Sequence, residues 1–90
     1  MIKKEWLKKR TTIEECETKN LVEDKRLGTT PVPFGFINHL WLNLKRKIQE
    51  GDELWEYCSP PETWENLCGR EGVCLVRGEE IIDRIITKMN

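Results

Sequence analysis

The feature that most constrains this fold is a one-sided apolar pattern over residues 34–48. Polar side chains occupy one side of the segment, and apolar ones recur on the other side at helical spacing: Ile37, Leu40, Trp41, Leu44 and Ile48. A helix with one apolar stripe must bury that stripe against a second layer. The strand-rich segment that follows provides such a layer, so the sequence predicts a central amphipathic helix packed on a small sheet.

Three segments after the central helix are predicted to form that sheet. Residues 53–58 and 73–76 are rich in aromatic and β-branched side chains, which favour strands. Gly78-Glu79 then suits a two-residue hairpin turn. Residues 80–89 allow two structures, because their isoleucines recur with a helical period while their β-branched composition favours a strand. We predict a strand with a bulge that shifts its alternation, and a helix is the alternative.

The N-terminal third of the chain is predicted to be mainly helical. Residues 1–10 are rich in Lys and Arg, and we expect them to form a solvated terminus with Trp6 resting on the domain. Thr11 and Glu14 have the spacing of a capping box, and a glycine follows a basic turn further along. This pattern predicts a helix over residues 12–27.

Ser59-Pro60-Pro61-Glu62 is the clearest local signal in the chain. Ser59 is expected to cap a short helix with Pro60 at its first position, which ends before Gly69. Because 90 residues are too few for two cores, we expect one domain over residues 1–90. The fold class predicted is α+β, with an N-terminal helical segment and the central helix on an antiparallel sheet of about three strands.

Charge and hydropathy argue against several classes of protein. No apolar run approaches the roughly 18 residues of a membrane span. The first residues lack the apolar segment of a signal peptide, which favours a cytosolic protein. A net charge of −1 argues against a dedicated nucleic-acid domain. A nucleic-acid-associated accessory protein is still an alternative, using the basic N-terminus together with Lys45, Arg46 and Lys47.

The side chains that carry chemistry form no recognisable motif. Cys16, Cys58, Cys68 and Cys74 are spaced more widely than the C-x₂₋₄-C pairs of structural zinc sites, so we expect reduced thiols and no metal. Disulfides or a small thiol- or metal-dependent protein are the alternatives. His39 is the single histidine, and either Ser59 or Cys58 beside it would make a nucleophile and base. No phosphate loop or cofactor motif is present, so catalytic activity is not expected.

The richest group of contact-forming side chains lies between residues 55 and 70. Interface hot spots favour Trp, Tyr and Arg, and this segment contains Trp55, Tyr57, Trp64 and Arg70. A small sheet is hard pressed to bury all three aromatic residues as well as those of the central helix. We therefore expect at least one of them to stay accessible, with Arg70 nearby.

The function predicted is that of a small protein-interaction or regulatory module without catalytic activity. Its partner would be an unidentified protein or a second copy of the chain. If all three aromatic residues lie in the core, the contact surface is expected instead around His39 and Leu42, on the polar side of the central helix.

Overall fold

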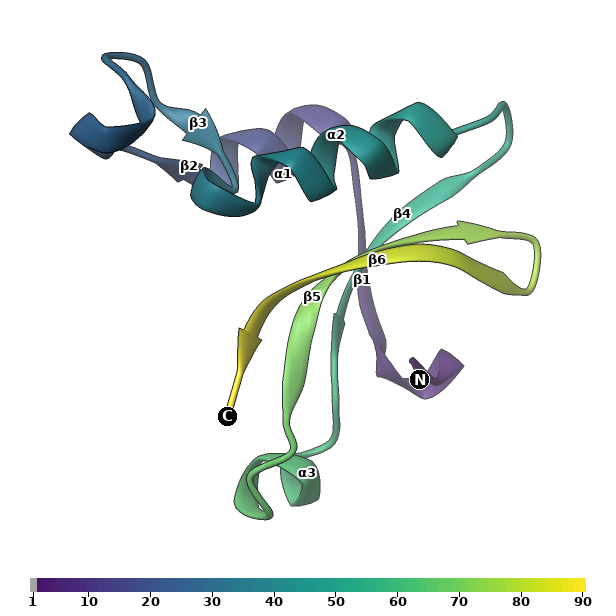
Figure 1. Cartoon of the computed structure of the whole chain (residues 1–90). Helices are drawn as coiled ribbons and strands as arrows, with labels where there is room; N and C mark the ends of the chain where they lie inside the picture. Colours follow the sequence, from purple (N-terminus) through teal and green to yellow (C-terminus); the bar gives the residue numbers. More distant parts are fainter. Residues whose placement is uncertain (1) are drawn as a thin grey trace.

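The protein is a two-layer α+β domain, seen here in a computed structural model that describes residues 2–90. A four-stranded antiparallel sheet has the strand order β1-β4-β5-β6. Helices lie across one end of one face of this twisted sheet (Figure 1). The molecule extends 38 × 36 × 17 Å, so its thinnest dimension holds one sheet and one layer of helices. The α+β prediction is confirmed, with four strands in the main sheet where about three were expected.

The elements follow one another as strands, short helices and single 3₁₀ turns. The main sheet contains β1 Leu7–Thr11, β4 Glu53–Cys58, β5 Arg70–Arg77 and β6 Glu80–Met89. A separate two-stranded hairpin contains β2 Leu21–Val22 and β3 Val32–Pro33. The helices are α1 Ile13–Lys19, α2 Asn38–Lys47 and α3 Pro61–Glu65, and the turns are η1 Lys4–Trp6, η2 Lys25–Leu27 and η3 Gly35–Ile37.

The central helix α2, continuous with η3, packs on the sheet as its periodicity predicts. Trp41 and Leu44 are fully buried, and Ile37 and Ile48 are half-buried beside them. Leu40 is 43% exposed, because it lies at the margin of the stripe and α2 turns Trp41 and Leu44 inward. The buried stripe is therefore narrower than the sequence suggests. Within the described residues, no helix is long and apolar enough to cross a membrane.

The C-terminal hairpin forms as predicted. Gly78 has a φ of +61° in the two-residue turn between β5 and β6, a conformation that glycine adopts without strain. Residues 80–89 form a strand, and its register shifts in two places, one of them between the Leu75 and Val76 pairs. The strand assignment and its bulge are thus confirmed. Such bulges increase the local twist, which here bends the outer strand around the sheet.

The helix predicted over residues 12–27 is wrong in its length. α1 ends at Lys19, where the Asn20 side-chain amide donates to the Cys16 carbonyl oxygen at 2.8 Å. The chain then enters β2, which pairs with a distant segment. The cap is also shifted by one residue, because the Thr12 hydroxyl, rather than that of Thr11, accepts the backbone N–H of Glu15 at 3.2 Å. Thr11 itself ends β1.

Two other local predictions need correction. Residues 7–11 form a strand of the sheet, so this part of the chain is not a solvated terminus. α3 begins at Pro61, and the buried Ser59 hydroxyl accepts the backbone N–H of Arg70 at 2.9 Å instead of capping the helix. Gly69 provides no left-handed stop. A Cβ atom there would overlap the Trp64 ring, so close packing is what requires glycine.

Candidate functional site

The two faces of the main sheet differ in what covers them. On the face under α1 and α2, here called the covered face, the core residues are Cys16, Phe34, Trp41, Leu44, Leu54, Val73, Leu75 and Ile85. On the opposite side, the open face, a smaller cluster contains Ile2, Tyr57, Cys74 and Val76, with Trp6, Leu7, Trp55 and Ile81 half-buried around it. Within the part of the chain that the structure describes, the 3₁₀ turn η1 is the only helical element in this second cluster.

A hollow of about 250 Å³ opens on this second side of the sheet, and we call it the arginine hollow. Its walls come from the N-terminal segment, β4, β6 and the start of β5. The residues that line it are Ile2, Trp6, Tyr57, Cys68, Arg70, Arg84 and Ile86. It combines aromatic and apolar walls with two guanidinium groups.

The two arginines differ from those basic residues of the protein that are held in ion pairs. Seven Lys or Arg side chains lie within 4.0 Å of a carboxylate. Among the described residues, neither Arg70 nor Arg84 has such a partner. One nitrogen of Arg70, Nη1, donates to the Gly69 carbonyl oxygen at 2.7 Å, which fixes the position of the side chain. The hollow therefore holds two positive charges with no carboxylate to compensate them.

Tyr57 is a wall of the arginine hollow rather than a reactive group. Its hydroxyl donates to the Ile85 carbonyl oxygen at 3.3 Å. Burial raises the pKa of Tyr57 to about 12, although the nearby Arg84 and Arg70 charges act in the opposite direction. The phenol is therefore neutral near pH 7 and its proton is already engaged.

The structure brings together only some of the residues predicted to bind a partner. Tyr57 and Arg70 line the arginine hollow, and Trp55 packs in the same open-face cluster. Trp55 is half-buried, with Nε1 donating to Glu53 at 2.8 Å. Trp64 is not among the lining residues. It lies on α3, where its Nε1 donates to the Ser59 carbonyl oxygen at 3.2 Å.

His39 and Leu42 lie in the helical layer, on the other side of the sheet. Both are exposed on α2, as predicted from their place on its polar side. Leu42 is 39% exposed, but the other exposed leucine of this helix, Leu40, is two residues away and points to the opposite flank. These apolar side chains therefore form no continuous contact patch.

Trp6 and Arg84 belong to the site although neither was predicted to bind a partner. The signal at Trp6 was an aromatic residue among basic ones, which alone does not place it on the sheet. Arg84 interrupts the isoleucine pattern of the last segment. Only the register of β6, in which Arg84 pairs with Cys74, places it on the open face.

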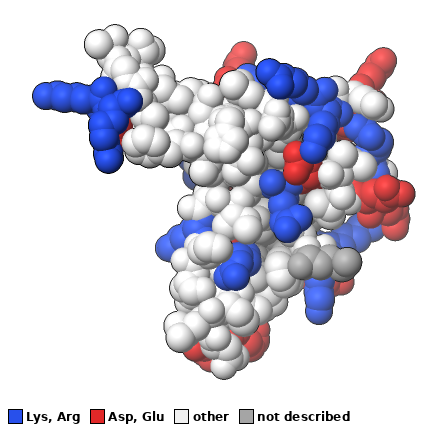
Figure 2. All heavy atoms as spheres, viewed as in Figure 1, with Lys and Arg blue, Asp and Glu red and all other residues white. Residues whose placement is uncertain are grey.

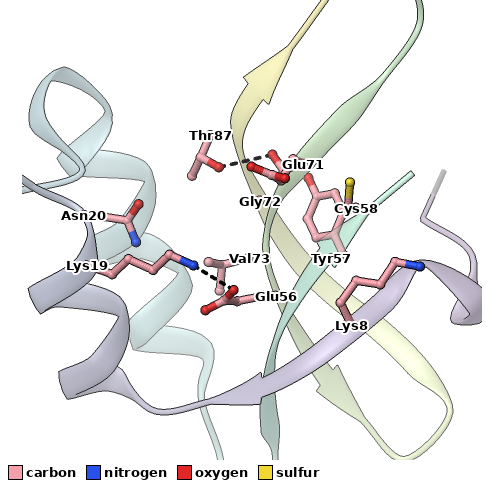
Figure 3. A pocket seen from close by; sticks show the side chains of 10 residues that line it. All are labelled: Lys8, Lys19, Asn20, Glu56, Tyr57, Cys58, Glu71, Gly72, Val73 and Thr87. Carbon is pink, nitrogen blue, oxygen red and sulfur yellow. Dashed lines mark hydrogen bonds and ion pairs between the residues drawn. The ribbon is translucent and has the colours of Figure 1, made fainter. Parts of the chain in front are cut away.

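A second hollow, of about 200 Å³, lies on the covered face below the end of α1 (Figure 3). Its charged groups compensate one another, with Lys19 Nζ 2.9 Å from Glu56 Oε1. The Thr87 hydroxyl donates to the Glu71 carbonyl oxygen at 3.3 Å. Lys8 and Cys58 reach its rim from β1 and β4. This polar gap between helix and sheet offers weaker contacts than the arginine hollow, because its central charges are already paired.

His39 does not lie beside either of the nucleophiles considered from the sequence, Ser59 and Cys58. Ser59 and Cys58 lie where β4 turns into α3, whereas His39 is on α2, at the opposite end of the molecule (Figure 1). In residues 2–90, no group of three or more His, Cys, Asp or Glu side chains is placed to hold a metal ion. Burial raises the pKa of the Cys16 thiol, and that of Cys74 to about 12, so both thiols are poor nucleophiles.

The basic segments proposed for nucleic-acid binding are neutralised in part by neighbouring acids. Lys45 is paired with Glu17 and Lys47 with Asp83, at 2.9 and 3.0 Å. In the N-terminal segment, Arg10 is likewise paired with an acid from β4. Figure 2 shows basic side chains in the middle of the molecule, below the helical layer, and acidic ones at the tip that carries α3. Ion pairing of this kind lowers the attraction for phosphates.

No protein-family model, no curated protein and no solved structure matches this chain. The functional argument therefore depends on the geometry of the molecule itself.

Proposed function

We propose that the protein is a small cytosolic protein-interaction module without catalytic activity, and that the open face is its contact surface. The observation that carries this proposal is the arginine hollow beside half-buried tryptophans, on a sheet face without a layer of long helices. The partner we propose is a segment of another protein, which would complete the cover of this face.

The composition of the open face supports this function. Trp, Tyr and Arg are the residue types most enriched at the energetic centres of interfaces. Trp6 and Trp55 are half-buried and keep part of their rings accessible, while Tyr57 is buried and holds the surface rigid. A rigid surface with aromatic groups binds a partner at a lower entropic cost than a flexible one.

The two arginines of the hollow are separate from the ion pairs that link the helices to the sheet. Four ion pairs involve side chains of α1, α2 or the sheet segments that they contact, among them Lys45–Glu17 and Lys47–Asp83. Arg70 and Arg84 take part in none of them. Their charges therefore remain available to a partner, and partner binding need not disrupt the domain.

A selection of peptides from a random display library tests the proposal. The wild-type protein should enrich a consensus sequence, and Trp55→Ala should lose that enrichment. Leu42→Ala is a matched control, because Leu42 is also an accessible apolar residue but lies on α2. The control should recover the same consensus as the wild type. Circular dichroism on each variant verifies that the fold is intact.

Two results would contradict the proposal, one from the peptide selection and one from sedimentation analysis. Equal enrichment by wild type and Trp55→Ala would move the contact surface away from the open face. Sedimentation analysis provides the other check. Concentration-dependent dimerisation that Trp55→Ala abolishes would show that the open face binds a second copy of this chain instead of another protein.

A further inference from the structure

The arginine hollow has a chemical preference that follows from its charges. Its lining includes Arg70 and Arg84 and no acidic side chain. By contrast, the hollow on the covered face contains Glu56 and Glu71 beside its lysines. Two like charges at one small hollow repel each other, and an anion bound between them removes that repulsion. A negatively charged group is therefore the occupant that the hollow favours.

The positions of the two guanidiniums suit an oxyanion. Arg70 stands at the start of β5 and Arg84 in the middle of β6, and both line the arginine hollow together with Tyr57. Within the described residues, the Arg70 guanidinium makes one hydrogen bond, to the Gly69 carbonyl oxygen. The remaining N–H groups can donate forked hydrogen bonds, which match the oxygens of carboxylate and phosphate.

The size of the hollow restricts what can carry the oxyanion. Sites for drug-sized molecules measure about 300–1,000 Å³. At about 250 Å³ the arginine hollow is below that range, and its apolar walls, Trp6, Ile2 and Ile86, narrow the space beside the charges. A single acidic side chain fits these dimensions better than a free nucleotide or cofactor. Exclusion of water by the walls strengthens the electrostatic attraction.

We propose that the arginine hollow is an oxyanion site, in which Arg70 and Arg84 bind the carboxylate or phosphate of one acidic side chain. This inference rests on the proposed function, because it supplies the group through which a partner segment docks on the open face. Trp6 and Ile86 contact the carbon atoms of that side chain, and the two guanidiniums bind its oxygens.

Nuclear magnetic resonance of the arginine side chains tests the site directly. In ¹⁵N-labelled protein at low, constant ionic strength, the N-acetyl N-methylamides of glutamate and O-phosphoserine are titrated in separate series. The Nε–H signals of Arg70 and Arg84 should shift in a saturable manner. The compound that binds more tightly shows which group the hollow prefers. The two compounds differ in charge, since a phosphate carries more negative charge than a carboxylate.

Three substitutions separate the site from general attraction to the surface. Arg84→Gln removes one charge from an exposed side chain and should weaken binding about tenfold or more, the usual effect of losing charge-assisted hydrogen bonds. Arg46→Gln is the matched control, because Arg46 is exposed on α2 and donates to the neutral Asn43 side chain. It should leave the affinity unchanged. Arg84→Lys, which keeps the charge without the fork, should recover part of the binding.

The inference is overturned if the shifts grow linearly with concentration, or if Arg46 shifts as much as Arg70 and Arg84. Unchanged affinity in Arg84→Gln would also overturn it. These results are independent of the peptide selection. A consensus without acidic residues, together with shifts that do not saturate, would keep the proposed function and exclude the oxyanion site, whereas saturable anion binding without any selected peptide would do the reverse.

Discussion

The covered face and the open face belong to one sheet but are stabilised by different means. Beneath α2, the ring of Trp41 lies 4.8 Å from that of Phe34, and its indole nitrogen donates to Glu17 on α1 at 2.8 Å. On the open face, Tyr57 and Trp55 are held by the sheet and by one turn of 3₁₀ helix. The first face therefore has two layers linked by packing and polar contacts, and the second has little more than the sheet itself.

This difference indicates how a small domain can combine stability with an accessible surface. Burial of apolar area is the main favourable contribution to folding, and the covered face provides most of it here. Full burial of the second face would require another layer, and 90 residues supply only short helices for it. The same shortage leaves aromatic and charged side chains of the open face within reach of a partner.

The strongest test of the comparison is to remove one tryptophan from each face. Trp41→Ala should cost about 3–5 kcal/mol, because it leaves a large cavity under α2. Trp55→Ala should cost about 1–2 kcal/mol, since the side chain is half-buried and the lost packing is smaller. Urea denaturation followed by far-ultraviolet circular dichroism measures both values.

The relative size of these effects decides whether the faces differ. Trp41→Ala would remove much of the roughly 5–15 kcal/mol that stabilises a typical domain, and we expect it to unfold partly or fully at 37 °C. If the two variants lose the same stability, the open face contributes as much to the core as the covered face. It cannot then be a surface left free for a partner.

The next largest effect concerns Gly72, where the open face leaves no space for a side chain. A Cβ atom at this position would overlap the Ile85 carbonyl oxygen on β6 and lie 3.1 Å from the Tyr57 hydroxyl. Because backbone atoms yield little, Gly72→Ala should cost about 1–3 kcal/mol. It should also break the hydrogen bond from Tyr57 to Ile85. The melting temperature and the ultraviolet titration of the phenol measure the two consequences.

A comparison with Gly28 makes this prediction specific. Apart from its chain neighbours, no described residue has an atom within 4 Å of a Cβ built at Gly28, although its φ of +120° strains any other residue. Gly28→Ala should therefore lower stability only by the backbone effect, and the titration of Tyr57 should not change. If Tyr57 titrates in Gly72→Ala as it does in the wild type, the strands can separate at residue 72 without loss of the site.

The elements predicted correctly from the sequence are those determined by residues that are close together in the chain. The stripe of α2 follows from helical periodicity, and the hairpin at Gly78 follows from the turn conformation that glycine allows. The strand at residues 80–89 was decided by the same turn, because two residues connect two strands more readily than a strand and a helix.

The elements that were missed depend on pairing between distant segments. Residues 7–11 alternate weakly and read as a charged terminus, yet they form a strand because β4 offers its edge. α1 is shorter than predicted because Leu21 and Val22 pair with β3. The site shows the same limit. Tyr57 and Arg70 were recognised by residue type, whereas Arg84 joins them only through the register of the sheet.

The smallest expected effect tests a polar contact between α1 and α2 on the covered face. Glu17 accepts hydrogen bonds from Trp41 Nε1 at 2.8 Å and Lys45 Nζ at 2.9 Å, and these contacts, that with Lys45 first, hold the pKa of Glu17 below its usual range. Because both charged side chains are about 30% exposed, solvent weakens the pair. Glu17→Gln should therefore cost about 0.5–1 kcal/mol at pH 7.

The pH dependence of this variant distinguishes charge from packing. A carboxylate whose pKa is lowered by folding stabilises the protein above its unfolded pKa, near 4.3, and this contribution is lost as pH falls through the lower, folded value. The stability difference between wild type and Glu17→Gln should thus narrow as pH falls below about 4.3, and it should close once pH is below the folded pKa of Glu17, where that carboxyl is neutral in both states. Glu14→Gln, an exposed change on the same helix, should show no such narrowing. A difference that persists undiminished at pH 2 would mean that the carboxylate charge does not link α1 to α2, and the covered face would then be stabilised by packing in the same way as the open face.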